Sequence, residues 1–521
     1  MKVRRANCPA CGGPVEFRVS SSLVAVCDFC QSVVARGDKK VEDHGKVSDI
    51  VQTNSPLGIG ISGRYQRKRF SITGRVQYRH PAGGTWDEWY LAFPGGRWGW
   101  LSESQGRFHL TFEKKVSEKI ELPDFDELKV GRVFTVKSGQ ALTVAEKGVA
   151  RVGGAEGEIP WEVVPNSELR FADLHGDEGA FATFDYSSPD PHVFFGNEVA
   201  LDDLDLTGSV LETDFPGAPN TTALQLNCPQ CAGALTLHAP DQSLRVCCPN
   251  CRSLLDVSEG KLEYLNTLSS RRIRPKIPLG SSGTLFGTEY TVIGFMERFA
   301  DQNHTWNWTE YLLYNPGQGF RWLVCNERHW SFVEPVSVDV PAVAKYTSSI
   351  PYKESTFQLY DRGSAHVRFV LGEFYWRVAV GDRVWAADFI APPQMLSFEW
   401  TQTQDSEELN VSLGHYMKVE EIEEAFNVSI RGAMGVGVIQ PRPENPGVLP
   451  LWAAFIAGLF VLLGIFNTGI VDPKPQNGLF VLCAGIVSII PVGLLFYNHS
   501  FEVQRWKDSD YSPYSSSDED D

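Results

Sequence analysis

The stretch WDEWYLAFPGGRWGWL, residues 86–101, contains two aromatic and aliphatic runs on either side of a Pro-Gly-Gly turn. Aromatic residues favour β-strands, and a glycine-containing turn between two such runs is typical of a β-hairpin. The stretch returns as WTEYLLYNPGQGFRWL at residues 308–323, where Trp308 and Glu310 match Trp86 and Glu88. A hairpin that occurs twice predicts a duplicated β module.

The duplication extends on both sides of this hairpin. GEIPWEV at 157–163, for example, resembles GEFYWRV at 372–378. Runs rich in Val, Ile, Tyr and Phe alternate with turn residues roughly every 8–12 positions, which is typical of an all-β domain. We therefore expect each copy to be a strongly bent sheet or a small barrel. The clearest helical segment is MKVEEIEEAF at 417–426, at the end of the second copy.

Two sets of paired cysteines precede the two modules. In each set, two CxxC turns are separated by 15 or 16 residues, a spacing that brings four thiolates around one tetrahedral ion, as in a zinc ribbon. We expect two structural zinc ions, and iron in a rubredoxin-like site is the alternative. The predicted ligands are Cys8, Cys11, Cys27 and Cys30 in the first set, and Cys228, Cys231, Cys248 and Cys251 in the second.

Cys247 is the extra thiol in RVCCPNCRS, residues 245–253. Alignment of the two sets places it opposite Val26, which is no ligand. It is therefore either a small buried hydrophobic residue or a weak alternate ligand.

Charge and cysteine content narrow the class of protein. The chain of 521 residues has a formal net charge of −17. An acidic surface repels phosphate groups, so we expect no nucleic-acid partner. CxxC pairs bind metal only as reduced thiols, which favours a reducing compartment such as the cytosol.

Two apolar runs near the end of the chain predict an integral membrane protein with two spans. Residues 449–467 and 478–497 contain no charged side chain and are each long enough to cross a bilayer as a helix. Their connection is short, so both ends of the hairpin lie on one side. Arg442, Arg505 and Lys507 flank that side, against Lys474 in the connection. The positive-inside rule then places the bulk of the chain and the C-terminus on the cytoplasmic side of the inner (cytoplasmic) membrane.

The repeated residues resemble a known family. The pattern WTEYLLYN…RWL, followed by GEFYWRVAVGDRVWAADFIAPPQMLSFEWT and EEIEEAF, is similar to the bacterial domain of unknown function 4178. The second copy matches nearly throughout, from 276 to 427, and the first matches well at 56–112 and more loosely at 127–200. The resemblance implies no established catalytic activity. It implies a place in membrane-stress or membrane-organising systems, with phage-shock-like coat proteins or band-7/flotillin-like proteins as partners.

No motif for a catalytic centre is present, so no catalytic residue is assigned. Repeated acids next to aromatic residues admit two interpretations: pairing with an arginine such as Arg97 or Arg321, or contact with a ligand or peptide in an aromatic groove. The groove residues would be Trp86, Glu88, Trp89, Trp308, Glu310 and Tyr311. Two further pairs of acids are repeated, Glu158 with Glu373 and Asp173 with Asp388.

The sequence thus predicts a mainly β protein: two zinc ribbons and two all-β modules in tandem, plus two C-terminal transmembrane α-helices. Its expected function is that of a membrane-anchored, cytoplasm-facing interaction scaffold. The alternative is a hydrolase or ligand-processing enzyme that uses the repeated acids. The expected units are zinc ribbon 1 at 1–40, β module 1 at 56–205, zinc ribbon 2 at 222–260, β module 2 at 276–428, a linker at 429–448, the membrane hairpin at 449–497 and a disordered acidic tail at 498–521.

Overall fold

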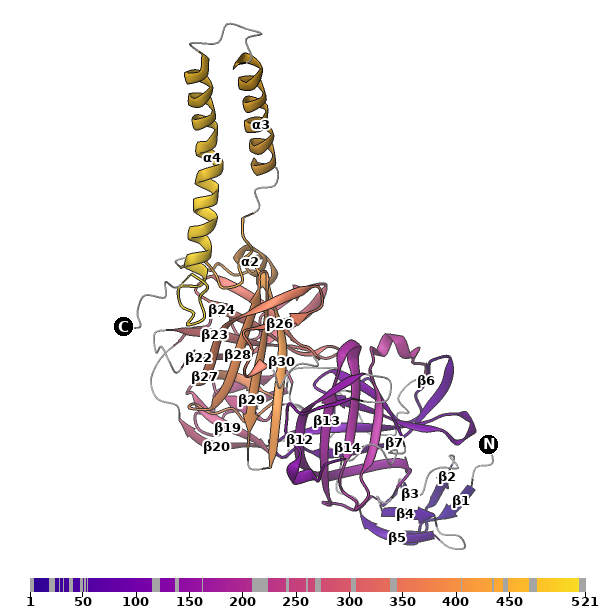
Figure 1. Ribbon diagram of the computed structural model, residues 1–521. Coiled ribbons are helices and arrows are strands. Elements are labelled where there is room, and N and C mark those ends of the chain that lie inside the picture. Colours follow the sequence, from indigo (N-terminus) through magenta and orange to yellow (C-terminus); the bar gives the residue numbers. More distant parts are fainter. Residues whose placement is uncertain are drawn as a thin grey trace.

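A computed structural model describes most of the chain. The described residues are 4–17, 24–27, 29–30, 32–36, 41–46, 50, 53, 55–114, 122–135, 140–161, 163–208, 224–239, 243–258, 261–267, 273–300, 306–337, 344–403, 405–432, 435–443, 448–467 and 476–514. Figure 1 shows two β-rich bodies side by side, with a helical hairpin rising from the second of them.

The first body contains a closed antiparallel barrel, which we call barrel 1. Its eight strands, counted within the described part of 58–200, form two four-stranded meanders, β7–β8–β9–β10 and β12–β13–β14–β15, closed by the pairs β10–β15 and β7–β12. The eight barrel strands are β7 (Lys68–Arg79), β8 (Thr85–Ala92), β9 (Trp98–Ser104), β10 (Arg107–Glu113), β12 (Ala141–Ile159), β13 (Glu168–His175), β14 (Ala180–Asp185) and β15 (His192–Glu198). Two short strands, β6 (Ser62–Tyr65) and β11 (Val133–Thr135), pair with β7 and β12, and the short 3-10 turns are η1 (Pro94–Gly96), η2 (Phe125–Glu127), η3 (Asp177–Gly179) and η4 (Leu201–Leu204).

The second body repeats this topology strand for strand, and we call its closed sheet barrel 2. The pairs β25–β30 and β22–β27 close two meanders, β22–β23–β24–β25 and β27–β28–β29–β30. The strands are β21 (Ser282–Leu285), β22 (Thr288–Ala300), β23 (Asn307–Asn315), β24 (Gly319–Asn326), β25 (His329–Pro335), β26 (Ser349–Tyr352), β27 (Ser355–Phe374), β28 (Arg383–Ala391), β29 (Gln394–Gln402) and β30 (Ser406–Met417). The duplicated hairpin of the sequence is β8–β9 in one barrel and β23–β24 in the other, as predicted.

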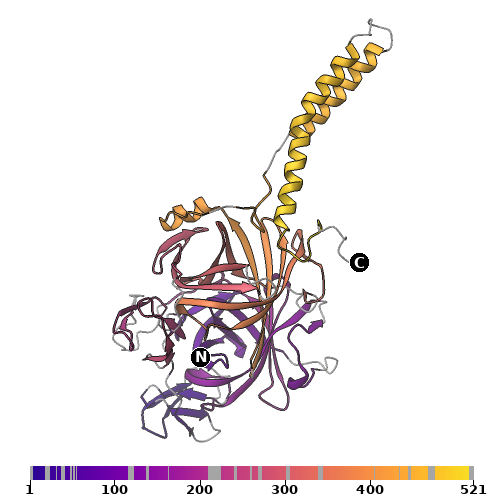
Figure 2. The same ribbon diagram turned by 90° about the vertical axis from the view of Figure 1, so that its left-hand side faces the viewer.

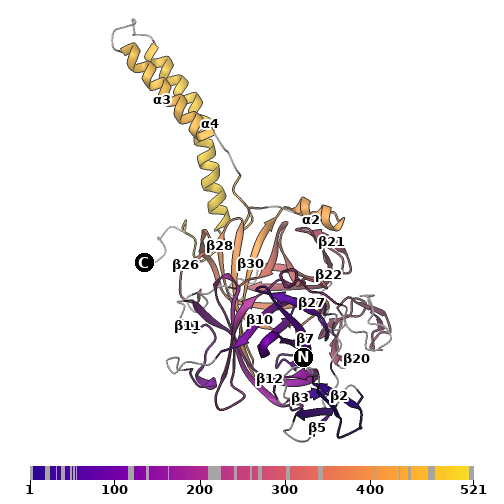
Figure 3. The same ribbon diagram turned by 90° about the vertical axis from the view of Figure 1, so that its right-hand side faces the viewer.

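Each barrel carries a small cysteine-bearing unit, and Figure 3 shows the first of them next to β12. Ribbon 1 consists of β1 (Arg4–Asn7), β2 (Pro14–Phe17), β3 (Val24–Val26), β4 (Ser32–Arg36) and β5 (Val41–Lys46). Ribbon 2 consists of β16 (Leu224–Asn227), β17 (Ala234–Leu237), β18 (Arg245–Cys247), β19 (Ser253–Ser258) and β20 (Lys261–Thr267). β3 pairs with the end of β12 and β18 with the end of β27, so each ribbon extends its barrel's sheet.

The two barrels are also joined directly. The middle of β12 pairs with the start of β30 at Glu146–Gly148 and Ser406–Glu408. The side chain of His80 bonds Glu146 at 2.5 Å beside this junction. Backbone pairing of this kind fixes both distance and register between the two bodies.

Three helices follow barrel 2: α2 (Val419–Phe426), α3 (Val448–Asn467) and α4 (Gln476–Arg505). The predicted helix at the end of the second copy is α2. Its stripe of Val419, Ile422 and Phe426 is buried against the outer face of barrel 2. Helices α3 and α4 lie side by side and project away from the barrels (Figures 1 and 2).

The structure differs from the sequence-based expectations for the C-terminal region in two respects, the membrane spans and the tail. Within the described residues, one helical stretch, Gly485–Arg505, is long and apolar enough to cross a membrane, and the apolar stretch Pro450–Leu462 of α3 is shorter. The expected disordered tail at 498–521 is wrong for 498–514, because Phe501, Arg505 and Trp506 are buried against barrel 2. Residues 515–521 lie outside the described part of the chain.

Candidate metal centres and barrel cavity

Two groups of four thiols have the geometry of metal centres. Within each group, the four Sγ atoms all lie within 4.8 Å of one another. The first group is Cys8, Cys11, Cys27 and Cys30, and the second is Cys228, Cys231, Cys248 and Cys251. The Sγ–Sγ distances are 3.6 Å for Cys8–Cys30 and 3.6 Å for Cys11–Cys27 in ribbon 1, and 3.7 Å for Cys228–Cys251 and 3.9 Å for Cys231–Cys248 in ribbon 2. A tetrahedral ion with Zn–S bonds of about 2.3 Å separates its sulfurs by about 3.8 Å. The thiols therefore fit such an ion and could hold one in each ribbon.

A serine stands beside the last thiol of each group. The Cys30 Sγ lies 3.4 Å from the Ser32 hydroxyl, and the Cys251 Sγ lies 3.1 Å from the Ser253 hydroxyl. The hydrogen bond with Ser32 lowers the pKa of Cys30 to about 6. Hydrogen bonds that stabilise a thiolate favour the ligand form, so these serines support metal binding.

Cys247 is not part of the second group, although it neighbours Cys248 in sequence. It is fully buried at the junction between ribbon 2 and barrel 2, among Ile293, Met296 and Val370. Burial raises the pKa of Cys247 to about 12, which keeps the thiol protonated. Of the two interpretations of Cys247, the structure supports the small buried hydrophobic residue.

The repeated acids Glu158 and Glu373 lie at the ribbon–barrel junctions. The Glu373 carboxylate accepts hydrogen bonds from the backbone N–H groups of His238 and Ala239, at 2.8 and 3.0 Å, and from the Ser243 hydroxyl at 2.9 Å. A buried carboxylate with three donors ties the loop of ribbon 2 to β27. Glu158 is buried at the matching end of β12, where it pairs with Ala25 of β3.

Strand alternation separates the six predicted groove residues. Trp86, Glu88, Trp308 and Glu310 face the barrel interiors, whereas Trp89 and Tyr311 are buried on the opposite face of the same strands. Trp89 donates to Glu103 at 2.9 Å, and the Tyr311 hydroxyl accepts from the Lys276 N–H at 2.9 Å. The six residues therefore do not form one groove, because successive side chains of a strand point to opposite faces.

The expected arginine partners are also different. Arg97 stacks on Phe112, with its guanidinium carbon 3.9 Å from the ring centre, and Arg321 donates to the backbone oxygens of Gln318 and Phe320. Glu310 instead pairs with Arg298 at 3.2 Å, and the same guanidinium nitrogen reaches Glu399 at 2.7 Å. The arginine comes from β22, a strand of the barrel wall that spacing along the hairpin did not suggest.

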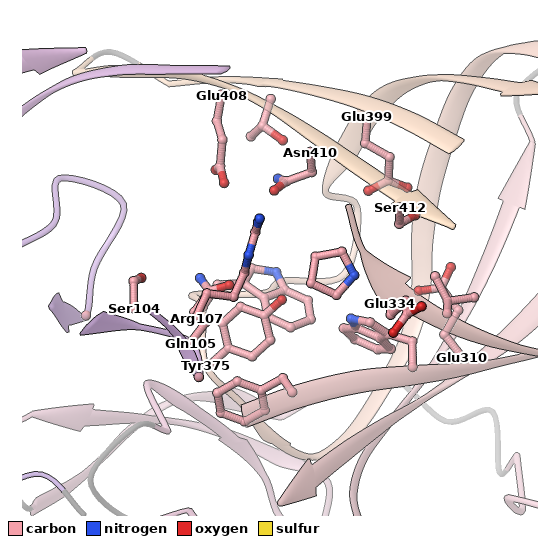
Figure 4. A pocket seen from close by; sticks show the side chains of 18 of the residues that line it. Ser104, Gln105, Arg107, Glu310, Glu334, Tyr375, Glu399, Glu408, Asn410 and Ser412 are labelled. Carbon is pink, nitrogen blue, oxygen red and sulfur yellow. The ribbon is translucent and has the colours of Figure 1, made fainter. Parts of the chain in front are cut away.

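The interior of barrel 2 is hollow and polar. It belongs to a continuous space of about 4370 Å³ that also runs along ribbon 1 and strands β7–β10 of barrel 1 and reaches the end of α4, so the interior of barrel 2 is only part of this volume. Figure 4 shows Glu310, Glu399 and Glu408 around this space, with Gln105 and Arg107 of barrel 1 opposite them. The repeated Asp388 lines the same cavity, but Glu373 does not.

Burial raises the pKa of several carboxyl groups inside both barrels. Burial raises the pKa of Asp388 to about 7, and burial together with the neighbouring Glu146 raises the pKa of Glu408 to about 7. In barrel 1, burial raises the pKa of Asp173 to about 8 and of Glu88 to about 7. These groups are partly protonated near neutral pH, because a charged carboxylate is poorly solvated there.

Sequence reasoning missed Glu399 and Glu408 as cavity residues. A signal for Glu399 exists in the repeat, since the register of the strands places it where Asp185 stands in barrel 1. Glu408 carries no such signal. It enters the cavity because β30 closes the barrel and meets β12 of the other body.

The chain was compared with curated proteins, solved structures and family models, and only a family model gave an informative match. No curated protein matches the chain. Among solved structures, the MucA/MucB complex of Pseudomonas aeruginosa is 10% identical, covering 72% of this chain and 94% of that one, with a TM-score of 0.10. Another structure, of MucB in complex with MucA(peri), is 11% identical, covering 70% of this chain and 94% of that one, with a TM-score of 0.09. Likenesses this weak do not bear on fold or function.

The family model of a domain of unknown function, DUF4178, matches residues 58–200 and 278–419. The two matches together span more than half of the chain and coincide with the two barrels described above. The chain therefore belongs to the DUF4178 family and contains two copies of its domain.

Proposed function

We propose that this protein is a membrane-anchored scaffold, whose barrels and zinc-filled ribbons face the cytoplasm and bind a protein partner. The observation that carries the proposal is helix α4. Most of α4 is apolar and exposed, and its C-terminal end, from Phe501 to Arg505, is anchored in barrel 2. A continuous helix of this kind holds a folded body at a fixed position relative to a bilayer.

The outer half of α4 has the surface of a lipid-facing helix. Its exposed large side chains are apolar, and α3 contributes a similar surface next to it. Trp452 of α3 donates to the Ser488 hydroxyl of α4 at 3.1 Å, which links the two helices within the apolar region. The exposed apolar residues are Leu451, Phe455, Phe460, Val461 and Leu462 of α3, and Leu482, Ile486, Ile489, Val492, Leu495 and Phe496 of α4. In water this surface would be costly, and in lipid it is favourable.

The inner end of α4 is held by polar contacts as well as apolar ones. Arg505 donates to the backbone oxygens of Val438 and Gln440 at 2.6 and 2.7 Å. The Tyr360 hydroxyl donates to the Arg505 backbone oxygen at 3.1 Å, and its ring lies 5.4 Å from that of Trp506. These contacts favour a fixed joint between anchor and barrel over a flexible tether.

Orientation rests on two arguments. The four-thiol groups bind metal as thiolates, which requires the reducing side of the membrane. Of the basic residues that flank the hairpin, Arg442 and Arg505 both pair with Glu502, whereas Lys507 is exposed, and Lys474 lies outside the described residues. Because Arg442 and Arg505 are already paired within the protein, the thiol groups indicate the orientation more directly than the basic residues do.

The anchor is tested by washing membranes at alkaline pH. We expect the full chain to stay in the membrane pellet. A double variant, Ile486→Lys with Ile489→Lys, should be released or degraded, since charged side chains are costly in the middle of a span. Tyr346→Lys is the matched control, because Tyr346 is a large, exposed residue away from α3 and α4. Release of the unaltered chain by the wash would contradict the proposal.

The partner is tested by crosslinking in native membranes. We expect a phage-shock-like or band-7/flotillin-like protein to be recovered with the full chain, and recovery to be lost when residues 1–208 are removed. Unchanged recovery after the removal would assign partner binding to the remainder of the chain. Absence of any membrane-organising protein among the crosslinked species would reject the scaffold function.

A second candidate function is enzymatic, because acids with a raised pKa gather in one cavity, as they do in many active sites. Asp388 and Glu408 both have a pKa near 7, the range that suits a general acid or base. The test is to incubate the purified full chain with a cell extract of small molecules and follow their turnover by mass spectrometry. Turnover that is lost in Asp388→Asn and kept in Asp190→Asn, at an exposed loop site, would favour the enzyme.

A further inference from the structure

The two barrels share one topology but differ in what fills them. In barrel 1, Tyr78, Trp100, Phe171 and Phe194 belong to one buried cluster inside the barrel, and the partly buried Trp86 packs against it. Trp86 lies 5.1 Å from Tyr78 and 5.3 Å from Phe171, measured between ring centres. Barrel 1 therefore has a solid aromatic core.

Strand register identifies the matching positions in barrel 2. Asp173 faces Thr183, and Thr183 faces Phe194; in barrel 2, Asp388 faces Ser397, and Ser397 faces Ser412. Ser412 thus replaces Phe194. By the same register, Ala386 replaces Phe171, and Arg298 replaces Tyr78.

The loss of two phenylalanine rings opens the interior of barrel 2. Ala386 and Ser412 both line the cavity, as do the four acids Glu310, Asp388, Glu399 and Glu408. Barrel 2 thus has an acid wherever barrel 1 has one at these positions, as Asp388 and Glu399 match Asp173 and Asp185, but it lacks the phenylalanine rings that fill barrel 1. Ala386 and Ser412 are too small to fill the interior, and an unfilled cavity lowers stability. An open interior is therefore expected to be kept for a function such as ligand binding.

The charges inside barrel 2 do not balance. Arg298 pairs with both Glu310 and Glu399 inside barrel 2. Arg107 of barrel 1 also lines the cavity, but it pairs with Glu198 of its own barrel. Within the described residues, neither Asp388 nor Glu408 forms an ion pair. Burial has the largest effect on the pKa of both acids and raises it, although the charge of Arg298 lowers the pKa of Asp388 and His80 of barrel 1 lowers that of Glu408. Unbalanced buried carboxylates are costly, and a bound cation would offset that cost.

The walls next to these acids are aromatic. Trp308, Trp322, Tyr375 and Trp376 line the same cavity, and Trp308 donates to Glu310 at 2.6 Å. Aromatic rings beside carboxylates favour organic ammonium groups over metal ions, because the rings attract a weakly hydrated cation. In addition, the Nε of the buried Arg298 has no hydrogen-bond partner among the described residues, so one donor remains for an acceptor atom on a ligand.

We propose that the interior of barrel 2 is a binding site for a small organic ammonium compound, held by Glu310, Asp388, Glu399 and Glu408 and by the indoles of Trp308 and Trp322. The cavity is also lined by Gln504, Lys507 and Asp508, which follow the exposed apolar part of α4. The ammonium group can therefore belong to a soluble compound or to a lipid headgroup.

The experiment uses the full chain, purified in detergent and loaded with zinc. Ethanolamine and choline are titrated by calorimetry and by thermal shift, with acetate as the anionic control ligand. In parallel, the chain is reconstituted in nanodiscs with and without phosphatidylethanolamine. Binding of the free amines identifies a soluble ligand. Stabilisation by phosphatidylethanolamine alone identifies a lipid headgroup, and both results support the site.

Three variants localise the binding. Asp388→Asn removes an unpaired acid and should weaken binding about tenfold or more, as loss of a buried charge partner does. Ser412→Phe restores the filling of barrel 1 and should abolish binding with every acid still present. Asp173→Asn, the same position in the filled barrel, is the matched control and should leave affinity unchanged.

The proposal is overturned if neither amine binds and phosphatidylethanolamine has no effect, or if Asp388→Asn and Ser412→Phe both bind as the unaltered chain does. Either outcome leaves the membrane anchor and the partner interaction intact, since those are measured by washing and crosslinking. The two proposals can therefore fail separately.

Discussion

Single residues show how one duplicated module acquired two different interiors. Glu88 and Glu310 occupy the same position in β8 and β23, but Glu310 pairs with Arg298, and a tyrosine stands at the arginine's position in barrel 1. Burial raises the pKa of both acids, that of Glu88 to about 7, and in Glu310 the charge of Arg298 opposes this rise. An arginine at one lumen position thus changes how the neighbouring acid is held.

The first prediction concerns pH. The pKa of Asp173 is about 8 in the folded chain, chiefly through burial, and about 3.9 in the unfolded chain. Between these values the folded state binds the extra proton, so stability should fall as pH rises and level off above the folded pKa. Asp173→Asn should flatten this slope and raise stability at the alkaline end by about 1–3 kcal/mol.

The measurement is urea denaturation at about pH 5 and about pH 8.5. Asp190→Asn, in an exposed loop, should keep the slope of the unaltered chain. A slope that Asp173→Asn leaves unchanged would show that another group is responsible.

The second prediction concerns the thiols. Cys231→Ser removes one ligand of ribbon 2 and should lower the metal content by about one ion per chain, since three thiolates hold zinc far less tightly than four. Cys247→Ala should keep both ions, because Cys247 packs in the junction instead of in the thiol group. Elemental analysis of the two purified variants decides the point; equal loss in both would make Cys247 a ligand.

At the level of elements, the joint between ribbon and barrel is a short piece of β-ladder that needs glycine. Gly372 of β27 has φ +86°, and a Cβ at this position would lie 2.2 Å from the Ile293 backbone oxygen. Gly157 of β12 repeats this, with φ +72° and the Thr73 oxygen at 2.3 Å. Both barrels thus use a glycine where the long strand turns from its barrel partner to the ribbon.

The third prediction tests this joint. Gly372→Ala should destabilise ribbon 2 by more than about 2 kcal/mol, since a clash with backbone adds to the strain of a positive φ. Gly381→Ala carries a similar φ, +95°, but meets no atom within 4 Å, and should cost only the φ strain. Hydrogen exchange of β18 and β19 measures the difference; equal protection in both variants would contradict the steric argument.

At the level of the whole molecule, α4, barrel 2 and barrel 1 form one connected body. Arg505 joins α4 to residues 438–440, and the β12–β30 pairing joins the barrels. In the membrane-anchored protein that we propose, a joint fixed in this way would set the height of the cavity and of both ribbons above the bilayer.

The fourth prediction tests that rigidity. Arg505→Ala leaves the backbone oxygens of Val438 and Gln440 without their donor and should loosen the joint by about 1–3 kcal/mol, while the chain stays in the membrane. Lys507→Ala, at an exposed site nearby, is the control. Hydrogen exchange at 435–443 should rise in the first variant alone; no rise would mean that the apolar contacts of Trp506 suffice.

The sequence by itself determined the duplication, the hairpins, the eight thiols of the two groups and the apolar runs. These features depend on residues near one another in the chain: a CxxC turn brings two thiolates together, and a Pro-Gly turn joins two strands. The helical stripe of α2 was predictable for the same reason.

Only the tertiary structure decided which faces became barrel interiors, how the ribbons attach and where 498–514 lies. Strand β8 is buried on both faces, since Trp89, Tyr90 and Leu91 are buried in succession. Its sequence therefore has no alternation of polar and apolar residues that would show which face points into the barrel. Closure by β10–β15 and β25–β30 joins strands far apart in sequence, and in the closed barrel 2 Glu399 reaches the same arginine, Arg298, as Glu310. Such pairings depend on the register of the whole sheet, which no local pattern encodes.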